Sequence, residues 1–509
     1  MPASDEPGPS LAAAALAIGK PALARSFRLH RPRGAFCHAG WCQQCEVVLP
    51  DGTRALACQT PASAGRVRKL GRPDPLRAIG HLAEGLPPWF WETRAIWPDA
   101  LRQPWLEMLR RLSSAKPLPA LGANESAPWR RGSCEVLIVG GGRSGLIAAR
   151  RLAETGRKTV LVEAERLGGI ARFSPTRAGE VAALVAQARQ AGAELRESAL
   201  CLGLYDGATR ALVLDEHGPE MIALEALVVA AGAYDRMPAF TGNDLPGILG
   251  GRAFLRLAAA QMLPEKCRIG LYTDEASAPR LLDAAAASDV AWHWIAGPGA
   301  LPAAQSLTFA RARLRRARGP GRLAEAEFEP GIRLACDLLV LGFSQPAYEL
   351  QMQAGRGAVL AGDPPVVRAT GPALLPLLEL GEAAGEADGP DFAYRVEAAL
   401  DGWIADPTRT DETELNAPAA TAVDPETVLC LCEDVRHGDC MRAIEDGYGD
   451  IELLKRRTGA GTGPCQGKLC HAELMACLAR SGKTPALPTQ RPLLRPVRLD
   501  ALAGADDGA

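Results

Sequence analysis

The chain has 509 residues, a length at which about three domains are expected. Its net charge of −2 offers no basic footprint for nucleic acid, and no run of 18 or more apolar residues predicts a transmembrane helix. Acidic Asp5 and Glu6 precede the first apolar stretch, where a secretory signal carries positive charge, so we expect a cytoplasmic protein. In that compartment its 14 cysteines are more typical of metal ligands than of disulfides.

A first group of cysteines follows a short Ala/Leu helix expected over residues 8–25. The group consists of Cys37, Cys42, Cys45 and Cys58. Their spacing, C-x4-C-x2-C-x12-C, is that of plant-type ferredoxins and predicts a ferredoxin-like [2Fe-2S] domain over residues 1–66. A zinc site is the alternative, because four thiolates also suit Zn²⁺.

Two hairpins normally frame such a cluster loop. Residues 47–49 and 54–57 predict the second of them, turning at Asp51-Gly52. Only the short stretch 26–34 occupies the position of the first hairpin, so we expect that hairpin to be absent or supplied by another chain.

Residues 67–132 form a connector without a recognisable motif. It is rich in tryptophan: Trp89, Trp91, Trp97, Trp105 and Trp129. We expect a packed interdomain segment, with subunit contact as the alternative role.

Residues 134–163 predict a strand, a glycine turn, a helix and a second strand, which is the pattern of a dinucleotide site. Gly140 makes the tight turn after the strand at 136–139, Gly142 lets a pyrophosphate approach the backbone, and Gly145 lets helix and strand pack closely. Glu163 ends the second strand, where a carboxylate accepts ribose hydroxyls and disfavours a 2′-phosphate. FAD or NAD is therefore expected instead of NADP. The alternative is a glycine turn in an α/β sheet that binds nothing.

Three later positions extend this first lobe, which we expect over residues 133–260 with a return at 336–405. Gly168 and Gly169 follow the ribose acid at the distance where flavoproteins bring backbone to the cofactor. Gly232 follows the strand at 226–230 as a second close approach. Glu382 resembles the acid that flavoproteins place beside the flavin's ribityl phosphate.

A second lobe is expected over residues 261–335, but its turn at 273–279 contains no glycine. Side chains there keep a pyrophosphate from the backbone, and Asp274 and Glu275 repel it. This lobe is therefore expected to be degenerate as a nucleotide site. Residues 406–426, polar and proline-containing, predict a linker.

The segment 427–481 predicts a second [2Fe-2S] domain. The ligands are expected to be Cys430, Cys432, Cys465 and Cys470. A C-x-C pair cannot place both sulfurs on one helix face, so it belongs to a loop, and the glycine-rich stretch before Cys465 would wrap the cluster. Zinc or an empty site is the alternative, and Cys440 and Cys477 are substitute ligands or, as we favour, core thiols. Residues 482–509 predict an extended tail that clamps onto a partner subunit.

These segments together predict an α/β fold: a two-lobed, Rossmann-like flavoprotein of the disulfide-reductase type between a ferredoxin-like module and a small helical cluster module. This order resembles the alpha subunit of heterotetrameric sarcosine oxidase and its relatives in opine oxidase, hydrogen cyanide synthase and proline or hydroxyproline dehydrogenase complexes. The resemblance is carried by SFRLHRPRG, WFWETRAIWP, VLIVGGGRSGLIAARRLAE, AAGAYDRMPAFTGNDLPGI and KRRTGAGTGPCQGKLC. The folate-binding, aminomethyltransferase-like domain of sarcosine oxidase alpha subunits has no counterpart in this sequence, so folate-coupled demethylation is not expected.

The resemblance implies a division of labour. A glycine-oxidase-like beta subunit holds FAD and oxidises a secondary amine or amino acid, and an FMN lies between the subunits. The alpha subunit binds an adenine nucleotide, which is FAD, NAD or ATP among the relatives, and a small third subunit is a further expected partner. The resemblance does not indicate the electron acceptor.

The leading hypothesis is therefore an oxidoreductase subunit that relays electrons through flavin and two [2Fe-2S] clusters, without catalytic residues of its own for substrate oxidation. The first alternative is an autonomous NADH-dependent iron–sulfur flavoprotein reductase. The second is a scaffold whose clusters are structural or sense redox state.

Overall fold

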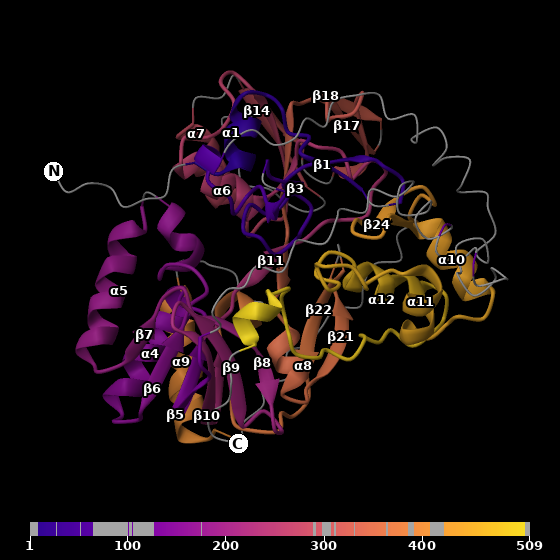
Figure 1. Cartoon of the computed structure of the whole chain (residues 1–509). Coiled ribbons are helices and arrows are strands. Elements are labelled where there is room, and N and C mark those ends of the chain that lie inside the picture. The colour runs from indigo at the N-terminus through magenta and orange to yellow at the C-terminus, as the bar shows by residue number, and fades with distance from the viewer. Residues whose placement is uncertain are drawn as a thin grey trace.

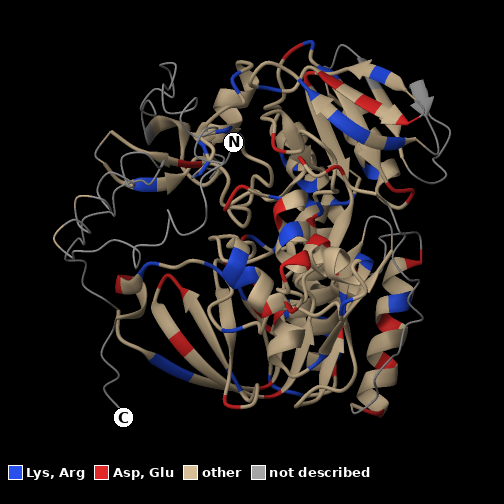
Figure 2. Ribbon diagram, turned by 90° about the vertical axis from the view of Figure 1, so that its right-hand side faces the viewer, with Lys and Arg blue, Asp and Glu red and all other residues tan. Residues whose placement is uncertain are grey.

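The computed structural model describes most of the chain outside the connector. The described residues are 9–26, 28–50, 52–64, 100, 104, 127–174, 176–288, 292–297, 307–309, 312–329, 331–362, 365–384, 391–407 and 422–503. Of the connector's five tryptophans only Trp129 lies in these ranges, as do only the two ends of the expected linker. No helix in these ranges is long and apolar enough to cross a membrane. Basic and acidic residues are interspersed along the ribbon, in line with the small net charge (Figure 2).

The N-terminal module packs against the second lobe (Figure 1). Its elements are α1 (Leu11–Ala17), β1 (Ala24–Arg25), β2 (Pro32–Arg33), β3 (Glu46–Val48), β4 (Arg54–Leu56) and η1 (Ala62–Ala64). β3 and β4 pair antiparallel as the expected hairpin. β1 also pairs with β2, through Ala24 with Arg33 and Arg25 with Pro32. The expectation that the first hairpin is absent or borrowed is therefore wrong: this chain supplies it as a two-residue ladder.

The first lobe is a seven-stranded sheet in the order β7-β6-β5-β10-β9-β8, with β23 also pairing β10. Its strands are β5 (Arg130–Val139), β6 (Thr159–Val162), β7 (Glu194–Arg196), β8 (Leu200–Tyr205), β9 (Arg210–Asp215), β10 (Gly218–Val229) and β23 (Leu377–Glu379). One face is covered by α4 (Arg143–Glu154), α5 (Ala178–Gln190) and α9 (Phe392–Ala405). Because β6, β10 and β23 all run parallel to β5 or to each other, their carboxyl ends meet at one edge, where the glycine loop lies.

The second lobe is a parallel five-stranded sheet, with an antiparallel meander inserted in the sequence before the last of its strands. In sheet order its strands are β12 (Ile248–Gly250), β19 (Leu338–Gly342), β13 (Arg268–Thr273), β14 (Trp292–Ala296) and β15 (Leu307–Phe309). The helices are α6 (Gly251–Ala259) and α7 (Ala278–Ala286), and the meander is β16 (Arg313–Arg318), β17 (Glu325–Glu329) and β18 (Ile332–Ala335). We expected the strand at 336–343 to return to the first lobe. β19 instead completes the second sheet, because its fully apolar strand is buried between β12 and β13.

The C-terminal module lies beside the hairpin of β21 (Gly357–Ala361) and β22 (Val366–Thr370) (Figure 1). It consists of β24 (Val428–Cys430), β25 (Val435–Arg436), α10 (His437–Glu445), α11 (Ile451–Thr458) and α12 (His471–Arg480). The remaining short elements are β11 (Ala233–Asp235), β20 (Ser344–Pro346), α8 (Glu349–Gln353), η5 (Gly169–Phe173), η6 (Gly381–Ala384) and η7 (Leu499–Leu502).

The tail, expected to clamp a partner, packs on this chain's own first lobe as far as residue 503. Leu494 N–H donates to the carbonyl oxygen of Leu202 at 2.8 Å, and Trp129 Nε1 donates to the carbonyl oxygen of Leu502 at 3.1 Å. Leu494 and Arg495 line a cavity with Val139, Gly140 and Val162, so the tail passes the carboxyl edge of the first sheet.

Candidate functional site

The glycine loop between β5 and α4 has the geometry that a phosphate group requires. Gly140 has φ +109°, and a Cβ there would lie 2.2 Å from the carbonyl oxygen of Ala230. A Cβ on Gly145 would lie 1.9 Å from the carbonyl oxygen of Gly140, so helix and strand pack too closely for a side chain. A Cβ on Gly142 would meet no atom within 4 Å. The loop therefore leaves open space at the start of α4, where backbone N–H groups favour an anion.

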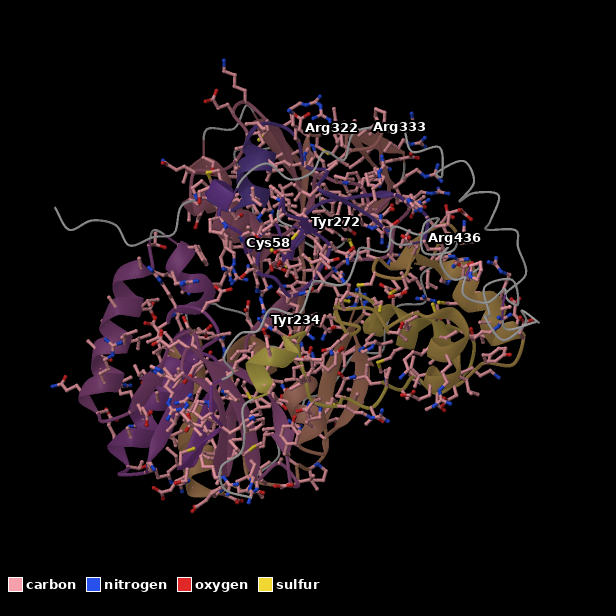
Figure 3. The ribbon with its side chains drawn as sticks, viewed as in Figure 1. Cys58, Tyr234, Tyr272, Arg322, Arg333 and Arg436 are labelled. Atoms are coloured by element: carbon pink, nitrogen blue, oxygen red, sulfur yellow. The ribbon has the colours of Figure 1, made fainter. Side chains whose placement is uncertain are left out.

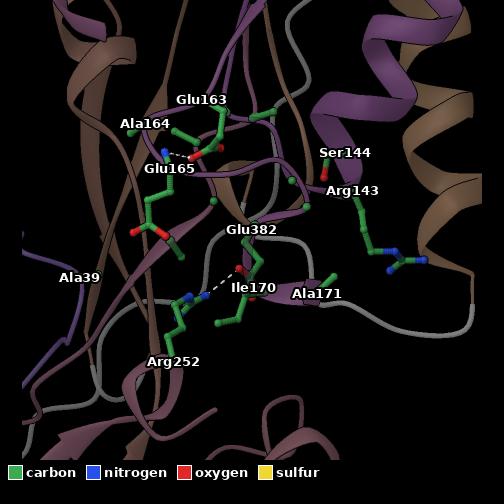
Figure 4. Close-up of a pocket in the computed structure, with 18 of the residues that line it drawn as sticks. Ala39, Arg143, Ser144, Glu163, Ala164, Glu165, Ile170, Ala171, Arg252 and Glu382 are labelled. Atoms are coloured by element: carbon green, nitrogen blue, oxygen red, sulfur yellow. Dashed lines mark hydrogen bonds and ion pairs between the residues drawn. The ribbon is translucent and has the colours of Figure 1, made fainter. Parts of the chain in front are cut away.

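Glu163 closes this loop from β6 (Figure 4). Its Oε2 accepts from Gly141 N–H at 2.7 Å, and its Oε1 accepts from Glu165 N–H at 2.8 Å. Burial raises its pKa above the usual value, while these two backbone bonds oppose the rise. Each oxygen keeps a second lone pair for a ribose hydroxyl.

Gly168 and Gly169 lie against the loop, as their sequence position suggests. Gly168 N–H donates to the carbonyl oxygen of Gly141 at 2.7 Å, and a Cβ on Gly169 would lie 3.1 Å from the Cα of Gly142. The structure thus brings both glycines to the wall of the same pocket.

Glu382 lines the far side of the pocket but is held in ion pairs. Its Oε2 lies 2.6 Å from Arg252 and its Oε1 lies 3.3 Å from Arg280, and Gly232 faces the same carboxylate (Figure 4). Burial would raise the pKa of Glu382, but the two guanidinium groups outweigh it and hold the pKa below its usual value. The carboxylate is therefore ionised at neutral pH and orients two arginines of the second lobe.

Five arginines of the pocket belong to no common motif of the sequence. The pocket is lined by Arg143, Arg252, Arg256, Arg280 and Arg495. They come from α4, α6, α7 and the tail, and no local pattern connects these segments. Arg495 also hydrogen-bonds Tyr234, at the junction with an adjoining cavity.

The degenerate turn of the second lobe differs from the loop at Gly140 in one decisive contact. Asp274 Oδ1 accepts from Ser277 N–H at 2.8 Å, just before α7 begins. A carboxylate of the chain itself therefore takes up a donor at the start of that helix. A carboxylate at this position would repel a phosphate, which is the reason for our expectation that this lobe is degenerate as a nucleotide site.

The first cysteine set gathers as two contiguous pairs. Cys42 contacts Cys37 and Cys58 contacts Cys45, while Cys37 also contacts Cys58. The N–H groups of Ala39 and Cys42 both donate to Cys37 Sγ at 3.4 Å. Burial raises the pKa of the Cys37 thiol to about 12, so a metal is needed to hold it as a thiolate.

The second set is formed by the loop after β24 and the loop before α12. Cys432 contacts Cys465, and Cys430 contacts Cys470. The Cys432 thiol lowers the pKa of Cys465 to about 7, against burial. Cys440 and Cys477 lie on α10 and α12, in the apolar core that also contains Cys430 and Cys470. The backbone at Gly463 packs closely against Cys432, because a Cβ on Gly463 would lie 2.3 Å from the Cβ of Cys432.

Each set brings four cysteines together in contacting pairs. A [2Fe-2S] cluster needs two thiolates per iron, and each set offers two such pairs.

The N-terminal cysteine set also adjoins the nucleotide pocket. Cys37 and Trp41 line that pocket together with Gly140 and Gly142. The ring of Trp41 lies 5.0 Å from that of Tyr234, centroid to centroid. Cys58 and Tyr234 mark this central region where the modules meet (Figure 3).

The two cysteine sets themselves meet at a buried boundary. Gln44 Nε2 lies 3.3 Å from Cys432 Sγ, and Cys37, Cys42 and Cys465 share one hydrophobic core. Asp434, which is fully buried, accepts from the N–H groups of Arg28 at 3.0 Å and Leu29 at 2.8 Å, clamping the two modules together. The pocket and both cysteine sets therefore form one continuous assembly.

Models of known families match three segments. Residues 2–69 match a 2Fe-2S iron–sulfur cluster binding domain, residues 138–192 an NAD(P)-binding Rossmann-like domain, and residues 424–505 the sarcosine oxidase A3 domain. The chain is 26% identical over 565 residues to the sarcosine oxidase subunit alpha of Rhizobium meliloti, covering 98% of this chain and 56% of the relative. The resemblance to the sarcosine oxidase alpha-subunit family is confirmed. The chain spans little more than half the length of that relative.

One further relative and one solved structure are also similar to this chain. The hydrogen cyanide synthase subunit HcnB of Pseudomonas aeruginosa is 28% identical over 418 residues, covering 66% of this chain and 90% of the relative. The crystal structure of L-proline dehydrogenase from P. horikoshii superimposes with a TM-score of 0.65 at 16% identity, covering 97% of this chain and 94% of that one. That likeness shows a shared fold: the two-lobed α/β architecture with its flanking modules.

Proposed function

We propose that this chain is the electron-transferring alpha subunit of a heteromeric, flavin-dependent amine or amino-acid oxidase or dehydrogenase. Sarcosine, an opine, proline and hydroxyproline are the substrate types we propose for the complex. One observation carries the proposal: Cys37 lines the same pocket as Gly140 and Gly142, and Gln44, next to the first cysteine set, contacts Cys432 of the second. A nucleotide pocket beside two neighbouring four-cysteine sets suits the transfer of single electrons better than substrate oxidation.

Within this proposal, specific residues bind each cofactor. The two cysteine sets hold one [2Fe-2S] cluster each, and an adenine nucleotide, FAD or else NAD or ATP, lies on the loop at Gly140. Glu163 binds its ribose, and the pocket arginines neutralise its phosphates. A bound flavin accepts two electrons and releases them singly, and the clusters carry one each.

The partners follow from the same reasoning. A glycine-oxidase-like beta subunit would hold FAD and oxidise the substrate, with an FMN at its interface with this chain and a small third subunit in some arrangements. No disulfide joins cysteines in the described residues, and we propose a reducing compartment such as the cytoplasm.

The test is anaerobic purification of this chain with and without its candidate beta subunit, followed by iron, sulfide, zinc and nucleotide analysis. About four irons and four sulfides per chain, as two [2Fe-2S] centres require, support the proposal. Normal substrate oxidation by the lone chain refutes it. Rapid flavin reduction by NADH in the lone chain establishes the autonomous reductase instead, and zinc in place of iron establishes the scaffold.

A further inference from the structure

The two cysteine sets are joined by one side chain, Gln44. Its Nε2 donates to the carbonyl oxygen of Cys42 at 3.0 Å and to Sγ of Cys432 at 3.3 Å. A single amide therefore touches the backbone of the first set and a sulfur of the second, 388 residues further along the chain. Gln44 is 8% exposed, so bulk water competes little for this contact.

A hydrogen bond to a cluster sulfur has a definite electronic consequence. The added electron increases the negative charge on the sulfurs, so a donated N–H stabilises the reduced state more than the oxidised one and raises the reduction potential. Burial strengthens that effect because the local dielectric is low. Among the second set, Cys432 is the one thiol that is only partly buried, and Gln44 of the N-terminal module contacts its sulfur.

We propose that Gln44 is a positioning residue that raises the reduction potential of the C-terminal cluster. The inference rests on the proposed function, in which Cys430, Cys432, Cys465 and Cys470 hold a [2Fe-2S] cluster. Because the amide belongs to the first module, the potential of the second cluster depends on the docking of the two modules. Gln44 therefore lies at the junction across which an electron would pass between the two clusters.

The chain offers a matched control in Gln59. This glutamine belongs to the same module, and its Nε2 lies 3.8 Å from Cys58 Sγ and 3.3 Å from the carbonyl oxygen of Cys58. It is exposed and contacts a sulfur of the first set. The side-chain amides of Gln44 and Gln59 therefore approach cysteine sulfurs of different sets.

The experiment is a redox titration followed by electron paramagnetic resonance, on the full chain in complex with its candidate beta subunit. Cys465→Ser identifies the signal of the C-terminal cluster, which it removes. For Gln44→Leu we expect that signal to titrate at lower potential, with about a tenfold smaller ratio of reduced to oxidised cluster at a fixed potential, which is about 59 mV for one electron. Gln44→Glu, similar in shape but without the donor and with added negative charge, should lower the potential at least as far.

Gln59→Leu should leave the C-terminal signal at its wild-type potential. An unchanged C-terminal potential in both Gln44 variants, with four irons retained, overturns the inference and leaves the proposed function intact. A shift confined to the N-terminal signal overturns it as well. Absence of the second cluster from the wild-type chain, seen as two irons, removes the proposed function itself and the inference with it.

Discussion

Arg236 and Glu473 form a buried ion pair across the boundary between the flavoprotein core and the C-terminal module. The Nη2–Oε1 distance is 2.5 Å, and the two side chains are 2% and 4% exposed. Arg236 follows β11 and also donates to the carbonyl oxygens of Pro365 and Met237, while Glu473 lies on α12, whose N-terminus adjoins Cys470. The pair therefore ties the second cysteine set to the strands beside the nucleotide pocket.

Removal of one partner of this pair should be strongly destabilising. Glu473→Gln leaves a buried guanidinium without its counter-charge, which costs roughly 3–5 kcal/mol of unfolding free energy. The double variant Arg236→Met/Glu473→Met should recover part of the loss. Thermal and urea unfolding of both variants provide the measurement, and the exposed pair Arg318 with Glu327 serves as the control that should change little. An unaltered midpoint for Glu473→Gln would contradict the assigned role.

Two loop glycines should respond to alanine in opposite ways. A methyl on Gly145 overlaps the carbonyl oxygen of Gly140, so Gly145→Ala should destabilise the chain by roughly 1–3 kcal/mol. A methyl on Gly142 meets only open space, so Gly142→Ala should keep its melting temperature without nucleotide but lose bound nucleotide. Melting curves and the nucleotide content of the purified variants test both expectations. Full nucleotide content in Gly142→Ala would show that the open cradle is not the phosphate site.

Arg495 should contribute to nucleotide retention from the tail. It lines the pocket, and Arg495→Ala removes a positive charge there without cutting the contacts of Leu494 to the first sheet. We expect a lower nucleotide content and a weaker gain in melting temperature on adding nucleotide. Arg498→Ala is the control, because Arg498 is exposed and pairs with Asp500. Equal nucleotide loss in both variants would point to the tail's packing and not to the charge in the pocket.

The iron content should separate ligands from core thiols. Cys465→Ser should lose about half of the iron, that is, one of two [2Fe-2S] centres. Cys477→Ser should retain it all, since Cys477 lies in the core between α10 and α12. Iron analysis of the two purified variants decides the matter. Iron loss from Cys477→Ser at unchanged stability would make that residue a ligand.

Glu382 should stabilise the chain in a pH-dependent way. Its folded pKa lies below the ordinary 4.5, because Arg252 and Arg280 outweigh burial, so the carboxylate is favoured in the folded state. That stabilisation is complete above about pH 4.5 and is lost as the pH falls toward the folded pKa. The melting temperature of Glu382→Gln should therefore lie below wild type at neutral pH and converge with it under acid conditions. A constant difference between pH 3 and 7 would contradict this.

Much of the candidate site was predictable from the sequence because its parts are local. Gly140, Gly142, Gly145 and Glu163 lie within one strand–turn–helix–strand unit of about 24 residues, and the local sequence determines the geometry of that unit. The spacing of Cys37, Cys42 and Cys45 is likewise fixed by one loop. Such patterns constrain the backbone directly, so the amino-acid order alone predicted the nucleotide loop and both cysteine sets.

Tertiary packing decided the rest. The pocket arginines, the contact of Gln44 with Cys432 and the place of β19 in the second sheet join segments between which no local pattern exists. A buried apolar strand can pair in either sheet, and a polar side chain can face solvent or a distant sulfur, with the same local sequence. The pairing or contact that forms depends on how much apolar surface is buried when whole modules pack together, and this is a property of the folded chain.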